Sequence, residues 1–201
     1  MFTTGKEKVL KVVSWLLAIG IAVAILAYWG NVNIKWQEEV RMADGEIFLV
    51  DRTAKGRMSK AELSSPWGWV KEEMTLEILK LPANWAPPPI WHCNKEYRPL
   101  LIDYQAQEHT WSVVATLLDC EVWKRLGRPA LPYVQYQSKN GGPWQVIPLE
   151  ERLIGRETNL LINPSYKGEP NLVTPEERDK RNRHTSKSDR IIVAVWKENN
   201  C

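Results

Sequence analysis

The chain has 201 residues, of which 44% are hydrophobic and 25% are charged. This is one domain's worth of polypeptide, and the composition excludes collagen-like, low-complexity and wholly disordered classes. Eleven Trp against two Phe make Trp the main large aromatic side chain, and its N–H needs a hydrogen-bond partner when buried. The net charge is +3, and residues 1–29 carry most of it, so the rest of the chain is nearly neutral. That balance argues against a nucleic-acid-binding domain, which would carry a dense basic surface.

Residues 12–29 form an apolar run without a charged side chain. At about 1.5 Å per residue the run makes a helix of roughly 27 Å, close to the thickness of the hydrocarbon layer of a bilayer. Trp15, Tyr28 and Trp29 lie near its ends, where amphipathic rings prefer the membrane interface. The run predicts a transmembrane helix. The alternatives are a core helix of a soluble protein and a signal peptide cleaved after Ala22-Val23-Ala24.

The residues that flank the apolar run predict whether it is cleaved and in which direction it crosses the membrane. Apolar residues continue from Ile25 to Trp29, beyond the possible cleavage site, which favours an uncleaved anchor. Three Lys precede the run, whereas Lys35 and Arg41 are the basic residues in the fifteen that follow it. Because basic flanks stay in the cytoplasm, we expect a single-pass bacterial inner-membrane protein with its N-terminus inside. The expected parts are a cytoplasmic tail at 1–11, the transmembrane helix at 12–29 and a periplasmic domain at 30–201.

Cysteine usage bears on redox environment and on metal binding. The chain has Cys93, Cys120 and Cys201, and none of them forms a Cys-x-x-Cys pair. The three His are scattered, so the sequence predicts neither a metal site nor a cofactor. A periplasmic domain meets oxidising conditions, which allow a disulfide between Cys93 and Cys120 and leave Cys201 over. The alternative is that these cysteines are unpaired buried thiols.

Much of the segment after the apolar run alternates polar and apolar residues, as half-buried strands do. Residues 36–42 and 46–52 flank Asp44-Gly45, which is typical of a β-hairpin. Residues 53–65 are polar and irregular, which predicts a loop. Both faces of 111–118 are mostly apolar, which predicts a central strand covered on two sides. The other expected strands are 73–81, 100–104, 133–137, 144–147, 159–163 and 190–197.

Two short helices are expected among the strands. Residues 119–126 are followed by Gly127 and Pro129, which are typical of a helix end. Thr174-Pro175-Glu176-Glu177 matches a capping box with Pro at the first helical position. The sum, about eight short strands without a fixed repeat, predicts a mainly antiparallel β-sandwich or partly open barrel after the transmembrane helix.

Two stretches resemble a family of uncharacterised bacterial proteins that look membrane-anchored or exported. The first stretch runs from Trp36-Gln37-Glu38-Glu39-Val40 through Asp44-Gly45 to Val50-Asp51-Arg52. The second contains Gly127-Arg128-Pro129, Pro132-Tyr133-Val134 and Trp144, and ends in Ile147-Pro148-Leu149-Glu150. The resemblance spans the end of the apolar run to Leu161, apart from a middle part around 84–92. It implies exported placement, but it implies no activity and transfers no catalytic residue.

Four Trp residues predict a binding surface. Trp67 and Trp69 lie on one face if their segment is extended, and Trp85 and Trp91 flank a stiff proline-rich stretch. Together they predict an aromatic groove for an extended peptide or a glycan. The alternative is that these rings close the ends of a small sandwich.

A basic segment at residues 178–190 holds six Lys or Arg against Asp179 and Asp189. It predicts contact with anionic lipid headgroups or cell-wall phosphate, and a solvated connector is the alternative. Its basic side chains are Arg178, Lys180, Arg181, Arg183, Lys187 and Arg190.

The candidate catalytic residues are Asp103, Glu108, His109 and Asp119, because paired carboxylates can hydrolyse glycans. Glu108 and His109 fall in an expected turn, and the sequence contains no nucleophile elbow, His-Glu-x-x-His pair or phosphate-binding Gly loop. We therefore expect a non-enzymatic protein that binds a protein partner, or another copy of itself, in an envelope assembly. The alternatives are an envelope enzyme or binder acting on cell-wall glycan, and a cytoplasmic domain whose basic run contacts lipid or nucleic acid.

Overall fold

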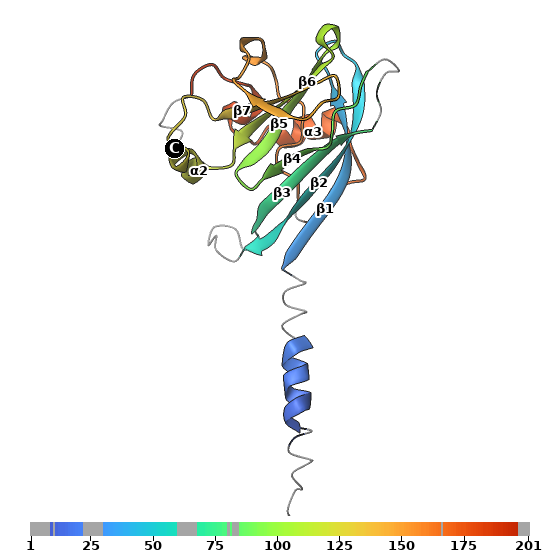
Figure 1. Ribbon diagram of the computed structural model, residues 1–201, viewed down its shortest axis with the longest axis vertical. Helices are drawn as coiled ribbons and strands as arrows, with labels where there is room; N and C mark the ends of the chain where they lie inside the picture. The colour runs from blue at the N-terminus through green and yellow to red at the C-terminus, as the bar shows by residue number, and fades with distance from the viewer. Residues whose placement is uncertain are drawn as a thin grey trace, which may run out of the picture.

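The computed structural model describes residues 9, 11–21, 30–59, 68–79, 81, 85–165 and 167–196. Residues 11–21 are helical, and two β-sheets follow them along the chain (Figure 1). The first sheet contains β1 (Asn31–Arg41), β2 (Ile47–Ser59), β3 (Gly68–Ile78), β4 (Trp91–Asn94) and β9 (Leu172–Val173). The second contains β5 (Tyr97–Gln105), β6 (Thr110–Leu117), β7 (Tyr133–Lys139) and β8 (Gln145–Ile147).

Short helices connect and cover these strands. The α-helices are α2 (Cys120–Arg125), α3 (Pro175–Asn182) and α4 (Lys187–Arg190), and the 3-10 turns are η1 (Ala106–Glu108) and η2 (Glu151–Leu153). Both predicted helices are confirmed, and so is the predicted N-cap of the second, Thr174. Asp119 accepts the backbone N–H of Val122 at 2.8 Å, and Thr174 accepts that of Glu177 at 3.3 Å.

The strand order is β4-β3-β2-β1-β9 in the first sheet and β5-β6-β7-β8 in the second. Among the described pairs, β1 and β9 are parallel and the others are antiparallel. The predicted hairpin joins β1 to β2, and Gly45 in its turn has a φ of +90°, which favours glycine. The predicted mainly β architecture is confirmed, and its two separate sheets fit a sandwich.

The inner faces of the two sheets enclose the main core. Trp36, Leu76 and Trp91 from the first sheet meet Trp111 and Val113 from the second. A second core lies on the other face of β6 and is built partly from residues after β8. As a result, every residue of β6 is buried, which confirms the predicted central strand. The second core consists of Leu100, Leu101, Val114, Leu153, Ile162 and Ile192.

Three predicted elements are wrong in the described residues. The expected loop at 53–65 is a strand as far as Ser59, because β3 pairs with this part of β2. Residues 159–163 are irregular, because the N–H groups of Asn159 and Leu160 both bond to the carbonyl of Leu100. Residues 191–196 form a single isolated bridge from Ile191 and no strand. The strands β4 and β9 were not predicted, since each is too short to give a pattern.

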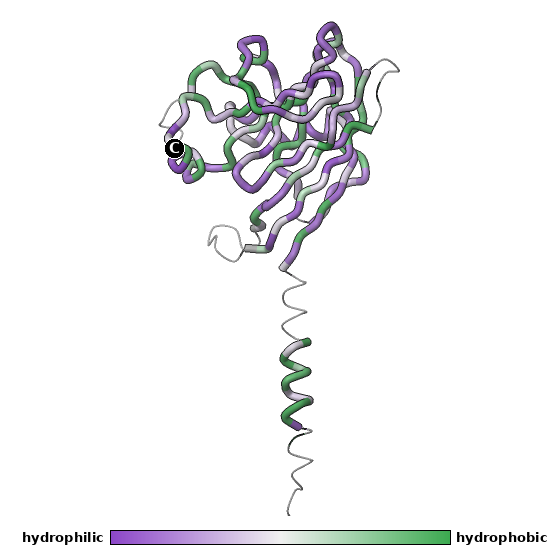
Figure 2. The backbone as a smooth tube through the Cα atoms, in the orientation of Figure 1, coloured by the Kyte–Doolittle hydropathy of each residue, from purple (hydrophilic) through white to green (hydrophobic). Residues whose placement is uncertain are grey.

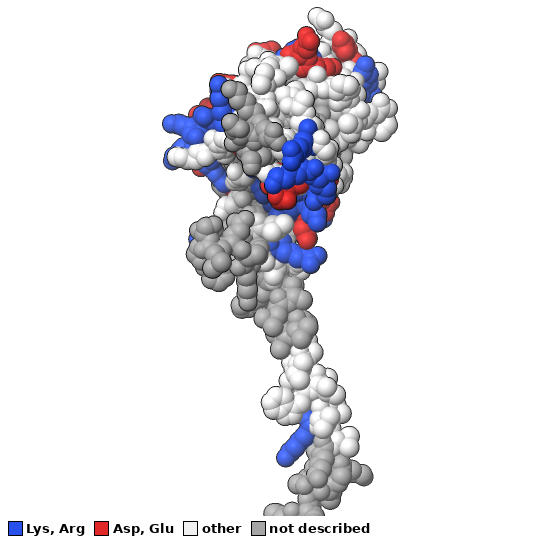
Figure 3. Space-filling model, turned by 90° about the vertical axis from the view of Figure 1, so that its left-hand side faces the viewer, with Lys and Arg blue, Asp and Glu red and all other residues white. Residues whose placement is uncertain are grey.

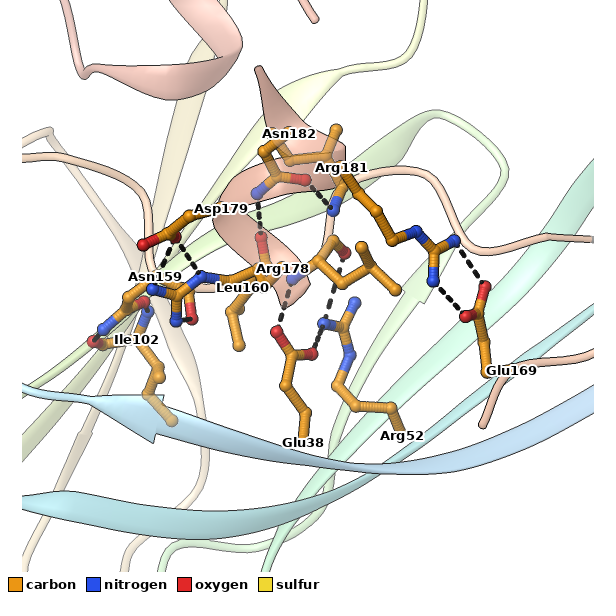
Figure 4. Close-up of polar contacts among 12 residues, drawn as sticks. Glu38, Arg52, Ile102, Asn159, Leu160, Glu169, Arg178, Asp179, Arg181 and Asn182 are labelled. Atoms are coloured by element: carbon orange, nitrogen blue, oxygen red, sulfur yellow. Dashed lines mark hydrogen bonds and ion pairs between the residues drawn. The ribbon is translucent and has the colours of Figure 1, made fainter. Parts of the chain in front are cut away.

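A buried ion pair links the first sheet to the irregular segment (Figure 4). Glu38 and Arg52 are fully buried on β1 and β2, and Arg52 Nη1 donates to Glu38 Oε2 at 2.8 Å. Glu38 Oε1 accepts the backbone N–H of Leu161 at 2.5 Å. Burial raises the pKa of Glu38, while the Arg52 charge, the Leu161 N–H and the Arg178 charge oppose the rise.

Helix α3 satisfies the remaining backbone groups of the same segment. Arg178 Nη1 donates to the carbonyl of Asn159 at 2.8 Å. Asn182 donates to the carbonyl of Leu160 at 2.9 Å and accepts the N–H of Ile162 at 3.2 Å. Side chains thus replace the strand partners that this buried backbone lacks.

We expect Glu38→Ala to lower the free energy of unfolding by about 3–5 kcal/mol, because Arg52 would stay buried without its carboxylate. Urea denaturation of the full-length protein, followed by Trp fluorescence, measures the change. The matched control is Glu39→Ala, since the next side chain along β1 points to the opposite face. The control should change the stability by less than about 0.5 kcal/mol. Similar losses in the two variants would contradict the role given to the ion pair.

Candidate functional site

A cleft of about 580 Å³ lies between α2 and the C-terminal segment at residues 186–196. This volume falls in the range of ligand-binding pockets. Figure 3 views the molecule from the side of α2, where Lys and Arg gather with carboxylates among them. The cleft combines apolar, hydroxyl and charged side chains, among them Arg98, Leu117, Asp119, Trp123, Ser186, Lys187, Ser188, Asp189, Val193, Val195 and Trp196.

One wall of the cleft is aromatic. Trp123 of α2 donates its indole N–H to the carbonyl of Pro129 at 3.0 Å, which fixes the ring. The Arg128 guanidinium lies over this ring at 5.7 Å, and Trp196 meets the ring edge-on with centroids 4.9 Å apart. Gly127 has a φ of +81°, and it turns the chain after α2 so that these groups can meet. These contacts hold Trp123 and Trp196 together as a fixed aromatic platform, which joins α2 to the C-terminal segment.

The opposite wall is polar and holds α4 against the second sheet. Arg98 Nη2 of β5 pairs with Asp189 Oδ1 at 2.8 Å, while Arg98 Nε is buried without a hydrogen bond to the described residues. Tyr133 of β7 donates its hydroxyl to the carbonyl of Ser188 at 2.8 Å. Burial raises the pKa of Tyr133 to about 12. These contacts keep Lys187 at the edge of the cleft.

The cysteines do not pair as predicted. Cys120, the first residue of α2, is disulfide-bonded, whereas Cys93 on β4 is a free, buried thiol. The predicted Cys93–Cys120 disulfide is therefore wrong, because the two residues belong to different layers. Cys93 Sγ donates to the carbonyl of Tyr97 at 3.4 Å, and burial raises its pKa to about 12. Cys201 lies outside the described residues.

The predicted aromatic groove is not formed by the Trp residues that the structure describes. Trp91 is 1% exposed and belongs to the core. Trp85 lies 3.8 Å from Tyr104, measured between ring centroids, and packs with it against the core. Trp69 also packs against the core, and Trp67 lies outside the described residues. The described rings close the sandwich, as in the alternative interpretation.

The basic segment 178–190 is divided between the interior and the surface. Arg178 is buried in the contacts to Asn159, and Arg181 binds Glu169 through two guanidinium nitrogens. The helical repeat of α3 causes the division, since it places Arg178 and Arg181, three residues apart, on one side of the helix. The segment is therefore not one continuous basic surface. Its exposed basic residues are Lys180, Arg183, Lys187 and Arg190.

The four candidate catalytic residues do not come together. Asp103 lies two residues from the turn end of the β5–β6 pair, is buried and is ion-paired with Arg152. Asp119 lies beyond the other end of this pair and caps α2. Glu108 and His109 sit at the turn between the strands, where His109 has a φ of +48°. The carboxylate pair proposed for glycan chemistry is absent among these residues.

A second hollow, of about 450 Å³, lies on the outer face of the first sheet and was not predicted. Thr53 and Thr75 share a hydrogen bond of 2.6 Å on its floor, and Asp51 faces Glu77 across the strand pair. His92 of β4 completes this polar row. The alternation of polar and apolar residues in each strand indicates that these polar side chains share an outer face. The two carboxylates come together only because β2 pairs with β3.

A polar cluster joins the two sheets near the 580 Å³ cleft. A β-bulge opposite Gly56 turns Lys71 of β3 toward the second sheet, and an added Cβ at Gly56 would lie 2.0 Å from a backbone oxygen. Lys71 Nζ and Arg98 Nη1 donate to the same Asn163 Oδ1, at 3.2 and 3.4 Å. Burial lowers the pKa of Lys71 to about 8, and the charges of Arg98 and Arg52 add to this.

Comparison with known proteins yields no relative. No family model matches the chain, and neither a curated protein nor a solved structure matches it. Within the described residues, no group of three or more His, Cys, Asp or Glu side chains is placed to hold a metal ion. The site must therefore be interpreted from its own chemistry.

The two described cysteines should differ in maleimide reactivity. In the native, non-reduced protein we expect neither Cys93 nor Cys120 to react, because one is buried and the other is disulfide-bonded. Denaturation without reductant should expose Cys93 alone of these two, and reductant should add Cys120. Peptide mass spectrometry assigns the labels, and Cys93→Ser is the control that removes the first one. Labelling of Cys120 before reduction would contradict the disulfide.

The free energy of unfolding should rise between pH 8 and pH 10.5, the folded and ordinary pKa values of Lys71. In this window the unfolded chain keeps a proton that the folded protein has lost, so raising the pH favours the folded state. Below pH 8 both states are protonated, and the cost of burying the charge is constant. Urea denaturation from pH 7 to the onset of tyrosine ionisation measures the rise.

Lys71→Met should remove this rise. Lys55→Met is the matched control, because Lys55 pairs with Glu73 on the exposed side of the same strand pair. An unchanged slope in Lys71→Met would show that another group titrates.

Proposed function

We propose that this protein is a single-pass membrane protein whose β-sandwich lies in the periplasm and binds a protein partner there. The observation that carries the proposal is an exposed apolar helix ahead of a sandwich that contains a disulfide. The cleft beside α2 is the surface proposed for the partner.

The helical residues 11–21 support the anchor. Trp15 is 70% exposed, and Leu16 and Leu17 are each 64% exposed. Figure 2 shows this segment as mostly hydrophobic above a hydrophilic lower end, with fewer hydrophilic positions than the strands have. A helix that is apolar on all sides needs a cover, and in this proposal lipid covers it. Within the described residues no helix has the length and apolar character needed to span a bilayer, and residues 22–29 of the predicted span are not described.

The disulfide supports placement outside the cytoplasm. Disulfides persist in the periplasm and are rare in the cytosol, where thiols are kept reduced. Cys120 is disulfide-bonded at the start of α2, on the floor of the cleft. The three Lys that precede the apolar run support the same orientation, with the N-terminus in the cytoplasm.

The cleft supports binding of a protein segment. Val195 is 71% exposed, and it lies beside the Trp123–Trp196 platform. Lys187 brings an exposed positive charge to the same cleft, whereas Arg98 is paired with Asp189 in its wall. Aromatic anchors next to Arg are typical of protein interfaces. The chemistry fits an extended segment with an apolar side chain next to a carboxylate.

Thiol labelling in intact cells tests the topology. A cysteine introduced by Val146→Cys, in a Cys93→Ser background, replaces an exposed side chain of β8. We expect a maleimide that crosses the outer but not the inner membrane to label it, and Lys11→Cys to be labelled only after lysis. Labelling of Val146→Cys only after lysis would place the sandwich in the cytoplasm. Release of the protein from membranes by alkaline carbonate would contradict the anchor.

Photo-crosslinking tests the cleft. A photoreactive amino acid at Val195 should trap a partner of defined size, and Lys187→Glu should weaken this crosslink about tenfold if one charge-assisted contact is lost. The same amino acid at Val146, an equally exposed position on the second sheet, is the control. Identical crosslinks from the two positions would exclude the cleft as the specific surface.

A further inference from the structure

Two cations from opposite sheets meet at one neutral oxygen. Lys71 of β3 and Arg98 of β5 both donate to Asn163 Oδ1, at 3.2 and 3.4 Å. An amide oxygen carries no net charge, so it leaves the repulsion between the two cations uncompensated. Asp189 pairs with the far side of Arg98, through Nη2. Among the described residues, no second carboxylate is ion-paired with Lys71 or Arg98.

Three buried hydrogen-bond donors on neighbouring arginines have no partner among the described residues. Arg98 Nε is buried and makes no hydrogen bond to the described residues. Arg52 is fully buried, and its Nε and Nη2 are also without partners in the part of the chain that the structure describes. Buried donors of this kind cost free energy unless water or an anion accepts from them. By contrast, Lys55 and Arg57 on the outer face are paired with carboxylates.

The cluster lies at the end of the sandwich where the chain leaves the predicted transmembrane run. The carbonyl of Gly30 accepts the N–H of Met58 at 2.7 Å, and Met58 pairs with Trp69 of β3. Lys71 is two residues farther along β3. With about 4.8 Å between strands and 3.3 Å per residue, Lys71 lies about 12 Å from Gly30. Strands β1 to β3 reach toward the helical residues in Figure 1.

We propose that Lys71, Arg98 and Asn163 form a site for the phosphate of a phospholipid headgroup. This inference rests on the proposed membrane placement. A phosphate oxygen in place of the Asn163 amide oxygen would accept charge-assisted hydrogen bonds from both cations. Asn163 is exposed, so its side chain can turn and present its amide N–H groups to the same phosphate.

The membrane is the source that the geometry favours. A domain held at a bilayer meets headgroups at a high effective concentration, so a site of modest intrinsic affinity becomes occupied. The anionic surface also attracts cations within a Debye length, about 8 Å at physiological ionic strength. Burial, together with the charges of Arg98 and Arg52, lowers the pKa of Lys71 to about 8, as expected for a cation whose nearest charged neighbours are also cations.

The test is a titration of full-length protein in uncharged detergent micelles with short-chain phosphatidylglycerol, followed by Trp fluorescence and by the thermal unfolding midpoint. We expect saturable binding and a higher midpoint. Inorganic phosphate is titrated in parallel to separate the two sources of the anion. Phosphate that binds as tightly as the lipid would overturn the headgroup assignment and leave a site for free phosphate.

Two variants probe the site without emptying the core. Lys71→Met should weaken binding by about tenfold, which corresponds to one lost charge-assisted contact. Asn163→Asp places a permanent carboxylate between the cations, so it should raise the midpoint without lipid and abolish the response to lipid. Lys55→Met is the matched control and should bind like the unmodified protein. Equal binding by all four proteins would overturn the proposal.

The lipid titration and the thiol-labelling experiment test the phosphate site and the membrane topology independently. Micelles contain no inside or outside, so lipid binding does not depend on where the sandwich lies in the cell. If thiol labelling places the sandwich in the cytoplasm while Lys71→Met still loses lipid, the proposed function falls and the phosphate site stands. If labelling succeeds and the titration shows no saturable binding, the anchor stands and this inference falls.

Discussion

The Glu38–Arg52 ion pair is the interaction on which the arrangement of the chain after β8 depends. Two opposite charges on neighbouring strands are fully buried, and the backbone of Leu161 completes their hydrogen bonds. A buried pair is tolerated only when its geometry is good and its remaining hydrogen bonds are satisfied. The pair is therefore stable only when the chain after β8 lies where the backbone N–H of Leu161 can donate to the Glu38 carboxylate. Helix α3 then secures that position by bonding to the backbone on both sides of Leu161.

The cluster around Arg98 collects positive charge that the described residues only partly neutralise. Arg98 stands at the centre, because it pairs with Asp189 in the wall of the cleft and shares Asn163 with Lys71. The proposed partner cleft and the proposed phosphate site are thus connected through one guanidinium.

The local parts of the fold could be predicted, and the site could not. The Asp44-Gly45 turn, the Thr174 cap and the doubly covered strand β6 each depend on a few adjacent residues. The strands predicted at 159–163 and 190–197 are not formed in the described residues. Side chains of α3 satisfy much of the backbone of the first segment, and backbone groups of residues 155–158 bond to that of the second. The aromatic groove is not formed by the described Trp residues, because apolar burial draws Trp91 into the core and packs Trp69 and Trp85 against it.

By itself the sequence determined the apolar N-terminal run, the β class of the rest of the chain, and most hairpins and caps, because these follow from periodicity and from residues close in the chain. The tertiary structure decided which cysteine is oxidised, which members of the basic segment face inward, and where Lys71 meets Arg98. These outcomes depend on contacts between positions far apart in the chain. Lys71 and Asn163 are on different elements, and only the bulge at Gly56 and the docking of α3 bring them together. Burial and charge act through space, so the chemistry of this site exists only once the two sheets have packed.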